Sequence, residues 1–416
     1  MESCEPWYIR IGRPLVFGAF RLGAWRLLGG YSGDVASMRL VDRVFWAFKR
    51  ETPLDGRRRP RRLLAGRLRA GLTELVADTA AARDISLVFV GDIMPLDAFA
   101  DTASKVELGP GVAELFRADV MLANLEGPIG DQDPDAPAVT GLFADAPRLA
   151  MTPAELQMHR GYLGADTVVM STANNHAWDL GVEGITRTVD ELEQVRAVPV
   201  GTGRTAAQTG HRVVTVAGLT IGLVPFTFGT NGLGGSPDEA GLVNVVPLNQ
   251  WRNTDVVDQV ANAVRACRAA GGDLVIASLH WGLEFEWFPV EQQIRTARRL
   301  VEAGADVVWG HHPHVIQPVE LYPGSPERTG LIMYSAGNLV TPMLSAHSRL
   351  SLAVRVTASR AGIRAIDLVP MVFSEADGPG AYRLDRLDVL AEQAPADSDV
   401  AEIVRHLRVT VPPSSP

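Results

Sequence analysis

The sequence ISLVFVGD, at residues 85–92, joins a short apolar run to a Gly-Asp pair. The run Ile85–Val90 is rich in Val, Ile and Leu, which is typical of a strand that is buried on both faces. Asp92 follows at the carboxyl end of this run. The same order, an apolar run and then a polar side chain of metal-binding type, recurs at five further places. We therefore expect an α/β domain with a polar site at its strand ends.

Six more apolar runs predict strands, at Val120–Ala123, Thr167–Ser171, Leu219–Phe226, Leu274–Leu279, Ala305–Trp309 and Leu331–Ser335. Helical patterns lie between several of these runs, at Val112–Arg117, Pro153–Leu163, Val182–Val195, Thr254–Ala270 and Pro289–Ala303. Strands that alternate with helices indicate an α/β fold class. The later runs alternate polar and apolar residues more strongly, as edge or antiparallel strands do, and they are Leu350–Val356 and Ile363–Val372.

The predicted strand ends carry Asp, Glu, Asn and His residues, namely Asp92, Asn124, Glu126, Asn174, Asn175, His176, His280, His311, His312, His314 and Asn338. Ligands bind outside the carboxyl ends of strands in open α/β sheets, so we expect these side chains at one edge. Mixed oxygen and nitrogen ligands suit Mn²⁺, Fe or Zn²⁺ better than Ca²⁺. Each motif alone is weak, since a Gly-Asp pair is usually a turn or a helix cap. Together they predict a site for one or two divalent metal ions.

Two side chains have roles that follow from their chemistry. A carboxylate such as Glu126 can bridge two cations held about 3.5–4 Å apart, and such a pair activates water for displacement at phosphorus. His176 directly follows Asn175, so it could stabilise developing charge on a substrate while Asn175 holds metal. Alternation places Glu284 on the same strand face as His280, where we expect it to orient a ligand or the substrate.

Composition excludes several classes of protein. Hydrophobic residues make up 46% and charged residues 21% of the 416 residues, as in globular rather than disordered chains. The only cysteines, Cys4 and Cys267, exclude a disulfide framework and a Cys-rich zinc site. Neither of the two lysines, Lys49 and Lys105, precedes Ser or Thr, which excludes the phosphate-binding loop GxxxxGK[ST]. The serine-hydrolase GxSxG and zincin HExxH motifs are also absent from the sequence.

Two other patterns fail as ligand motifs. Residues 201–206, GTGRTA, match a dinucleotide-binding turn, but no acidic residue lies between Arg204 and Asp238, so we expect only a strand-to-helix turn. Three aspartates within residues 131–135 mimic the start of a calcium loop. The twelfth position of that loop should be Glu and is Leu142, so we expect an acidic surface loop.

The net charge of −9 is unevenly distributed along the chain. Residues 1–83 hold 16 basic and 8 acidic residues, whereas residues 84–416 hold 23 and 40. We predict a basic, aromatic-rich, helical N-terminal extension at 1–83, a domain with the site at 84–375, and a C-terminal tail at 376–416. The extension either packs on the body or a partner through an apolar face, or lies on an anionic membrane.

The sequence favours a cytoplasmic protein, with residues 1–83 as a route to a peripheral position at the membrane. The most apolar stretch, Pro14–Tyr31, is interrupted by Arg21 and Arg26, and we find no signal peptide. Nucleic-acid binding is disfavoured, because the body is acidic and no base-reading fold is indicated.

Six motifs follow one another in a fixed order: VGDIM at 90–94, ANLEGP at 123–128, ANNHAWDLG at 173–181, HWGLE at 280–284, GHHPH at 310–314 and YSAGN at 334–338. In order and spacing they resemble the capsule-synthesis CapA-type, or poly-γ-glutamate biosynthesis, proteins of the calcineurin-like metallophosphoesterase superfamily. The resemblance covers about residues 85–375. It implies a four-layer α/β/β/α sandwich with metal ions between the strand ends and loops.

The resemblance also implies roles for single residues. Its metal ligands correspond to Asp92, Asn175, His280, His312 and His314, with Glu126 as the bridging carboxylate and His176 as the catalytic histidine. Five further residues are expected to support these ligands or to contact the substrate: Asn124, Asp179, Glu284, His311 and Asn338. The wider superfamily has a His where this chain has Met94. One metal site therefore lacks an imidazole, and a second site is weak, empty, or completed by Asn124, Glu284 or water.

Two functions stay open at this point. The first is a metal-dependent hydrolase, in which a water oriented by Asn175 and His176 attacks a phosphoester or an amide-type bond of an anionic polymer. The polymer would belong to capsule or poly-γ-glutamate biosynthesis. The second is a non-catalytic accessory subunit of a polymer synthesis and export complex. Its metal site would be structural or polymer-binding, and residues 1–83 would dock it to a membrane-bound partner.

Overall fold

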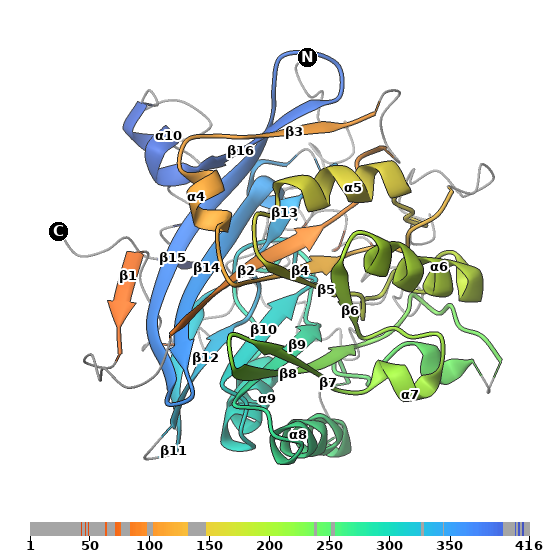
Figure 1. The fold of residues 1–416 in the computed structure, drawn as a ribbon, viewed down its shortest axis with the longest axis vertical. Helices are drawn as coiled ribbons and strands as arrows, with labels where there is room; N and C mark the ends of the chain where they lie inside the picture. The colour runs from red at the N-terminus through yellow and green to blue at the C-terminus, as the bar shows by residue number, and fades with distance from the viewer. Residues whose placement is uncertain are drawn as a thin grey trace.

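Two β-sheets lie face to face, and helices cover their outer faces (Figure 1). The computed structural model describes residues 43, 46, 49, 63–64, 71–75, 84–97, 103–131, 147–236, 239–250, 254–325, 328–343, 345–393, 404, 407 and 410–411. Within this part of the chain, the predicted four-layer α/β/β/α sandwich is confirmed.

The first sheet has ten strands and combines a parallel half with an antiparallel half. The parallel half consists of β2 (Ile85–Ile93), β4 (Val120–Leu125), β5 (Thr167–Ser171) and β6 (Ala197–Val200). The antiparallel half continues from β2 through β14 (Leu350–Ser359), β15 (Gly362–Glu375) and β16 (Ala381–Arg386). Three short strands add to it: β1 (Gly71–Glu74) beside β15, β3 (Lys105–Leu108) beside β16, and β13 (Asn338–Val340) beside β2.

The second sheet has six strands, of which the central four are parallel. Its order is β11 (Val319–Ser325), β12 (Arg328–Met333), β10 (Val307–His311), β9 (Leu274–His280), β8 (Leu219–Thr227) and β7 (Arg212–Val216). The two outer strands, β11 and β7, pair antiparallel with their neighbours.

Helices form the two outer layers. The first sheet is covered by α4 (Val112–Phe116), α5 (Pro153–Tyr162) and α6 (Gly181–Gln194), and the second by α8 (Thr254–Ala269) and α9 (Glu291–Glu302). The remaining short helices are α7 (Ala206–Thr209), η4 (Ala240–Leu242), η5 (Ala346–Arg349) and α10 (Leu387–Gln393). In Figure 1, α8 and α9 lie at the bottom, and α5 and α6 lie in the right half of the view.

Both faces of the central strands are buried, which explains their continuous apolar sequences. In β2, Leu87 and Phe89 pack into the cluster between the sheets, whereas Val88 and Val90 pack under the helices of the first sheet. Successive side chains of a strand point to opposite faces, so both sets must be apolar. Trp309 joins the two sheets, because its indole N–H donates to the Val90 carbonyl at 3.1 Å.

All seven apolar runs and the five helical patterns correspond to observed elements, with ends that differ by up to three residues. The runs at 350–356 and 363–372 are antiparallel as expected, but β14 and β15 are interior strands and not edges. The turn at 201–206 joins β6 to α7, as predicted. The missed strands include β7 and β16, whose side chains are partly exposed and partly polar.

The predicted acidic surface loop is described only at Asp131, and strand pairing crosses the predicted domain boundaries. Asp131 is exposed and accepts from Arg187 at 2.9 Å, whereas Asp133 and Asp135 lie outside the described residues. Two strands outside the expected 84–375 domain, β1 and β16, both pair with β15. The expected division of the chain into three parts stays a prediction.

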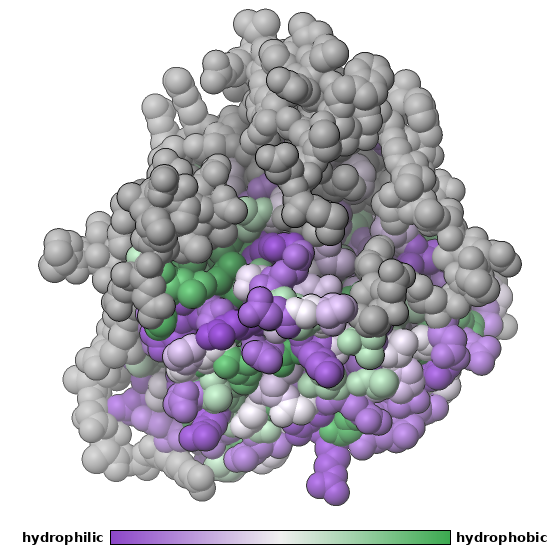
Figure 2. All heavy atoms as spheres, turned by 90° about the horizontal axis from the view of Figure 1, so that it is seen from above, coloured by the Kyte–Doolittle hydropathy of each residue, from purple (hydrophilic) through white to green (hydrophobic). Residues whose placement is uncertain are grey.

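The surface of the body is mixed in polarity. On the face seen in Figure 2, hydrophobic patches lie between hydrophilic ones. The large apolar side chains that are exposed among the described residues are Leu63, Val213 and Val245. A search of the same residues for a helix that is long and apolar enough to span a membrane finds none.

Gly91 is the tightest backbone contact near the strand ends. A Cβ atom there would lie 2.0 Å from the carbonyl oxygen of Gly337, which accepts from Asp92 N at 3.0 Å. We expect Gly91→Ala to lower the free energy of unfolding by at least about 2 kcal/mol, because overpacking forces the backbone apart. A Cβ atom at Gly161 in α5 would meet no atom within 4 Å, so Gly161→Ala should stabilise by up to about 1 kcal/mol. Urea unfolding measures the free energy of unfolding of both variants. If Gly91→Ala were as stable as Gly161→Ala, the close backbone approach at Gly91 would be contradicted.

Candidate metal centre

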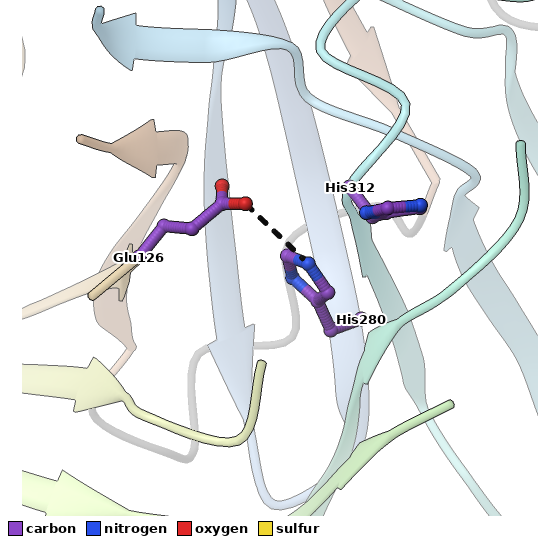
Figure 3. Close-up of side chains that lie close together, drawn as sticks. All are labelled: Glu126, His280 and His312. Atoms are coloured by element: carbon purple, nitrogen blue, oxygen red, sulfur yellow. Dashed lines mark ion pairs between the residues drawn. The ribbon is translucent and has the colours of Figure 1, made fainter. Parts of the chain in front are cut away.

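The candidate site lies where strands of both sheets end on the same side of the sandwich. Asp92 is the penultimate residue of β2, and Glu126 directly follows β4. His280 is the last residue of β9, and His312 directly follows β10. Figure 3 shows Glu126 reaching from the first sheet toward His280 and His312 of the second. Parallel strands of both sheets therefore contribute their carboxyl ends to one site.

Glu126, His280 and His312 form the first of three groups whose ligand atoms lie within 4.8 Å of one another. Glu126 Oε1 is 3.7 Å from His280 Nε2. Both oxygens of Glu126 and both ring nitrogens of His312 are buried and lack a hydrogen-bond partner among the described residues. Burying such atoms without partners is costly. A divalent cation would satisfy them, and this donor set fits Mn²⁺, Fe or Zn²⁺.

Two further groups overlap the first, namely Glu284, His312 and His314, and then Asp92, Glu126 and His314. His314 Nε2 lies 3.6 Å from Glu284 Oε1 and 3.7 Å from Glu126 Oε1. Glu126, His312 and His314 each belong to two of the groups. The donors therefore suffice for one ion or for two neighbouring ions.

The backbone of the HHPH segment is unusual at its two ligand positions. The φ angles of His312 and His314 are 91° and 54°, in the left-handed region that residues other than Gly rarely adopt. Each such residue costs about 1–3 kcal/mol and persists only where its surroundings hold it. Here His312 N donates to Asp92 Oδ2 at 3.3 Å, and Phe285 N donates to the Pro313 carbonyl at 2.9 Å. The turn brings the rings of His312 and His314 within 5.9 Å of each other.

Asp92 is fully buried and is surrounded by nitrogen atoms. Asn124 Nδ2 donates to Asp92 Oδ1 at 2.9 Å, and His311 Nδ1 lies 3.1 Å from the same oxygen. Burial raises the pKa of Asp92, but the hydrogen bond and charge of His311 and the charge of His314 outweigh it and lower the pKa. Asp92 is therefore held as a carboxylate, which is the form that binds metal.

The other groups are shifted toward their neutral forms. Burial raises the pKa of Glu126 well above its usual value, and the charges of Asp92 and Glu284 add to the effect. Burial lowers the pKa values of His280 and His312 well below their usual values, and neighbouring imidazoles lower them further. Neutral imidazoles keep the lone pairs that metals need. Because three carboxylates share this buried volume, a cation would stabilise all of them.

Asn175 is held by Asn231, a residue that none of the sequence motifs contains. Asn175 Nδ2 donates to Asn231 Oδ1 at 3.3 Å, and Asn175 Oδ1 lies 2.7 Å from His280 Nε2. Asn231 is buried and adopts a left-handed φ of 53° in the loop after β8. Its position after a predicted strand, Leu219–Phe226, was the signal that could have found it.

His176 is fixed by its own loop. Its Nδ1 lies 2.7 Å from Asp179 Oδ2, which also accepts from Leu149 N at 2.6 Å. The His176 backbone N–H donates to Asn174 Oδ1 at 3.1 Å, and Asn174 Nδ2 donates to the Leu125 carbonyl at 2.7 Å. These bonds leave Nε2 of His176 as the ring atom that can face a substrate.

The remaining predicted residues lie around the same centre. Asn338 Oδ1 is 2.9 Å from His314 Nδ1, which orients the other ring nitrogen toward Glu126 and Glu284. Met94 is buried, and its sulfur accepts a hydrogen bond from the Thr341 hydroxyl at 3.5 Å. All the predicted site residues are thus brought together, and their individual roles stay predictions.

Comparison with known proteins identifies a family and several relatives. A family model described as "Bacterial capsule synthesis protein PGA_cap" matches residues 86–343. The PGA biosynthesis protein CapA of Bacillus subtilis is 26% identical over 310 residues, which cover 73% of this chain and 75% of that protein. A Mycobacterium tuberculosis protein named "Probable polyglutamine synthesis accessory protein" is 33% identical over 245 residues, which cover 55% and 57%.

Among solved structures, the sulfate thiohydrolase SoxB of Thermus thermophilus matches with a TM-score of 0.32 and 14% identity. The match covers 80% of this chain and 61% of that chain.

The geometry predicts the metal content of purified protein. We expect wild-type protein to carry Mn, Fe or Zn, and His312→Ala to lose most of it, because His312 belongs to two of the three donor groups. The exposed His211 provides a matched control, and His211→Ala should keep the wild-type content. Elemental analysis after gel filtration measures all three proteins. Metal content that is unaffected by His312→Ala would rule out this residue as a ligand.

Proposed function

We propose a metal-dependent hydrolase function for this chain, which belongs to the family of bacterial capsule synthesis proteins, PGA_cap, over residues 86–343. The family resemblance carried by the six motifs is thereby confirmed. The proposed substrate is an anionic polymer of capsule or poly-γ-glutamate synthesis, cleaved at a phosphoester or an amide-type bond. The names of the chain's relatives, which refer to PGA biosynthesis and polyglutamine synthesis, support this substrate class.

One observation carries the proposal: buried carboxylate oxygens and imidazole nitrogens converge without hydrogen-bond partners among the described residues. The residues that would hold one or two divalent ions are Asp92, Glu126, Asn175, His280, His312 and His314. When bound, such an ion polarises a substrate oxygen and makes water a better nucleophile. Glu284, which lies beside His314, would supply a further carboxylate donor to the site.

Asn175 and Asn231 act as a pair in this proposal. The hydrogen bond from Asn175 Nδ2 to Asn231 Oδ1 fixes the side-chain amide of Asn175. Its oxygen is then directed at His280 Nε2 and the donors around it. An amide that is fixed in this way needs little reorganisation when a substrate binds.

His176 is the proposed catalytic residue. Asp179 fixes its ring by the contact at Nδ1 and stabilises the ring when it is protonated. Nε2 would then donate a proton to the leaving oxygen or nitrogen of the cleaved bond. The acidic body, which holds 40 acidic and 23 basic residues over 84–416, repels a polyanion except where bound cations neutralise the site.

The second candidate function is that of an accessory subunit that binds the polymer without cleaving it. The name of the Mycobacterium tuberculosis relative favours it, as does Met94, which packs against Thr341 and offers no imidazole. The two functions differ in turnover, because an accessory subunit would bind poly-γ-glutamate in a metal-dependent way and leave its chain length unchanged.

Turnover by the variant His176→Asn tests the hydrolase. We expect Mn²⁺- or Zn²⁺-loaded protein to cleave p-nitrophenyl phosphate esters or poly-γ-glutamate, and His176→Asn to lower kcat by about 10²–10⁴-fold. Its metal content should equal that of wild type, because the imidazole is not expected to be a ligand.

The matched control is His211→Asn, which should keep the wild-type rate. If the loaded wild type turns over no substrate of either class, or if His176→Asn is as fast as wild type, the hydrolase proposal is wrong. Metal-dependent polymer binding without cleavage would then establish the accessory function.

A further inference from the structure

Residues of the N-terminal segment reach the candidate metal centre. Trp46 Nε1 donates to Glu284 Oε2, and Lys49 Nζ lies 3.2 Å from Glu286 Oε1. The Trp46 and Phe285 rings also pack, with centroids 6.2 Å apart. Trp46 and Lys49 are helical residues three positions apart, a spacing that places both on one helix face. Both lie outside the family match at 86–343.

Glu284 uses its two oxygens for different partners. Oε2 accepts from the indole N–H of Trp46, and Oε1 lies 3.6 Å from His314 Nε2. Glu284 is also one of the three side chains in the group with His312 and His314. The indole therefore occupies the outer oxygen, and the inner oxygen stays directed at the imidazoles.

The loop that carries Glu284 is held on both sides. Phe285 has a left-handed φ of 57°, which a large side chain adopts only when its surroundings hold it there. Gln317 Nε2 donates to the Glu286 carbonyl at 2.8 Å, and Lys49 holds the Glu286 side chain. Lys49 is only 3% exposed, so its contact with Glu286 is largely shielded from solvent.

We propose that Trp46 is a positioning residue of the metal centre, which fixes Glu284 so that one carboxylate oxygen faces the ion shared with His312 and His314. Lys49 fixes the same loop through Glu286. Trp46 and Lys49 are thus part of the site. This inference rests on the metal centre of the proposed function and not on turnover.

The variant Trp46→Phe removes the indole donor and keeps a ring against Phe285. We expect Trp46→Phe to raise the dissociation constant of Co²⁺ or Zn²⁺ at the site of Glu284, His312 and His314 about 10-fold. Loss of a partner that orients a metal ligand has an effect of this size. Competition with a chelator measures this constant. The absorption spectrum of the Co²⁺-loaded protein should shift, because the ligand sphere changes. In the background of Glu284→Gln, Trp46→Phe should have no further effect on either readout.

Leu64→Ala separates positioning from general loosening of the segment. Leu64 is fully buried against the layer of α8 and α9, and Arg298 Nη2 donates to the Leu63 carbonyl at 3.0 Å. We expect Leu64→Ala to lower the midpoint of thermal unfolding and to leave the metal dissociation constants unchanged. If Trp46→Phe does not fold, Lys49→Met tests the same loop. It should also weaken metal binding at the site of Glu284, His312 and His314.

These measurements distinguish failure of the positioning proposal from failure of the hydrolase proposal. Wild-type affinity in Trp46→Phe, or in Lys49→Met where that variant replaces it, overturns the positioning role and leaves the hydrolase proposal intact. Equal weakening in Leu64→Ala overturns it as well. Weakened affinity in Trp46→Phe without turnover by the wild type supports positioning and refutes the hydrolase. A wild type that binds no metal refutes both.

Discussion

The buried carboxylate of Glu126 is the constraint on which the rest of the site depends. Neither of its oxygens has a hydrogen-bond partner among the described residues, and the carboxylates of Asp92 and Glu284 lie close by. Isolated buried charge costs several kcal/mol, so such a group stays ionised only beside compensating charge. The surrounding imidazoles of His280 and His312 are kept neutral by burial and cannot provide it. A divalent cation would provide that compensation, and the buried donors around Glu126 are compatible with one.

The two sheets supply the donors jointly, so the site depends on how the two sheets pack against each other. Glu126 comes from the first sheet and His280 from the second, so neither sheet alone carries a complete set. The layer between them, with Phe89 and Trp309 in edge-to-face contact, fixes the spacing of the sheets. The outer helices bury the remaining faces. Packing far from the site therefore determines whether oxygen and nitrogen donors meet.

Much of this arrangement could be predicted from the sequence, for physical reasons that also explain the failures. Strands buried on both faces give continuous apolar runs, and the ends of parallel strands share one edge, so Asp92 and His280 were found. Edge strands such as β7 have one exposed face and no such run. Asn231 follows a predicted strand, but this position is a weak signal, because a lone Asn in a Gly-rich turn belongs to no recognisable motif. The contact of Trp46 spans 238 residues, and no local periodicity encodes it.

The order of the strands along the chain has a consequence for biosynthesis. β2 lies between β4 and β14, and β14 begins only at Leu350. On the ribosome, β2 therefore emerges with one edge unpaired, and it stays so until most of the chain has been translated. The loop at Gly337, which accepts from Asp92 N, is also made late. The donor set around Glu126 therefore assembles only after translation has passed this point, so a cation at this site would bind during the last steps of folding.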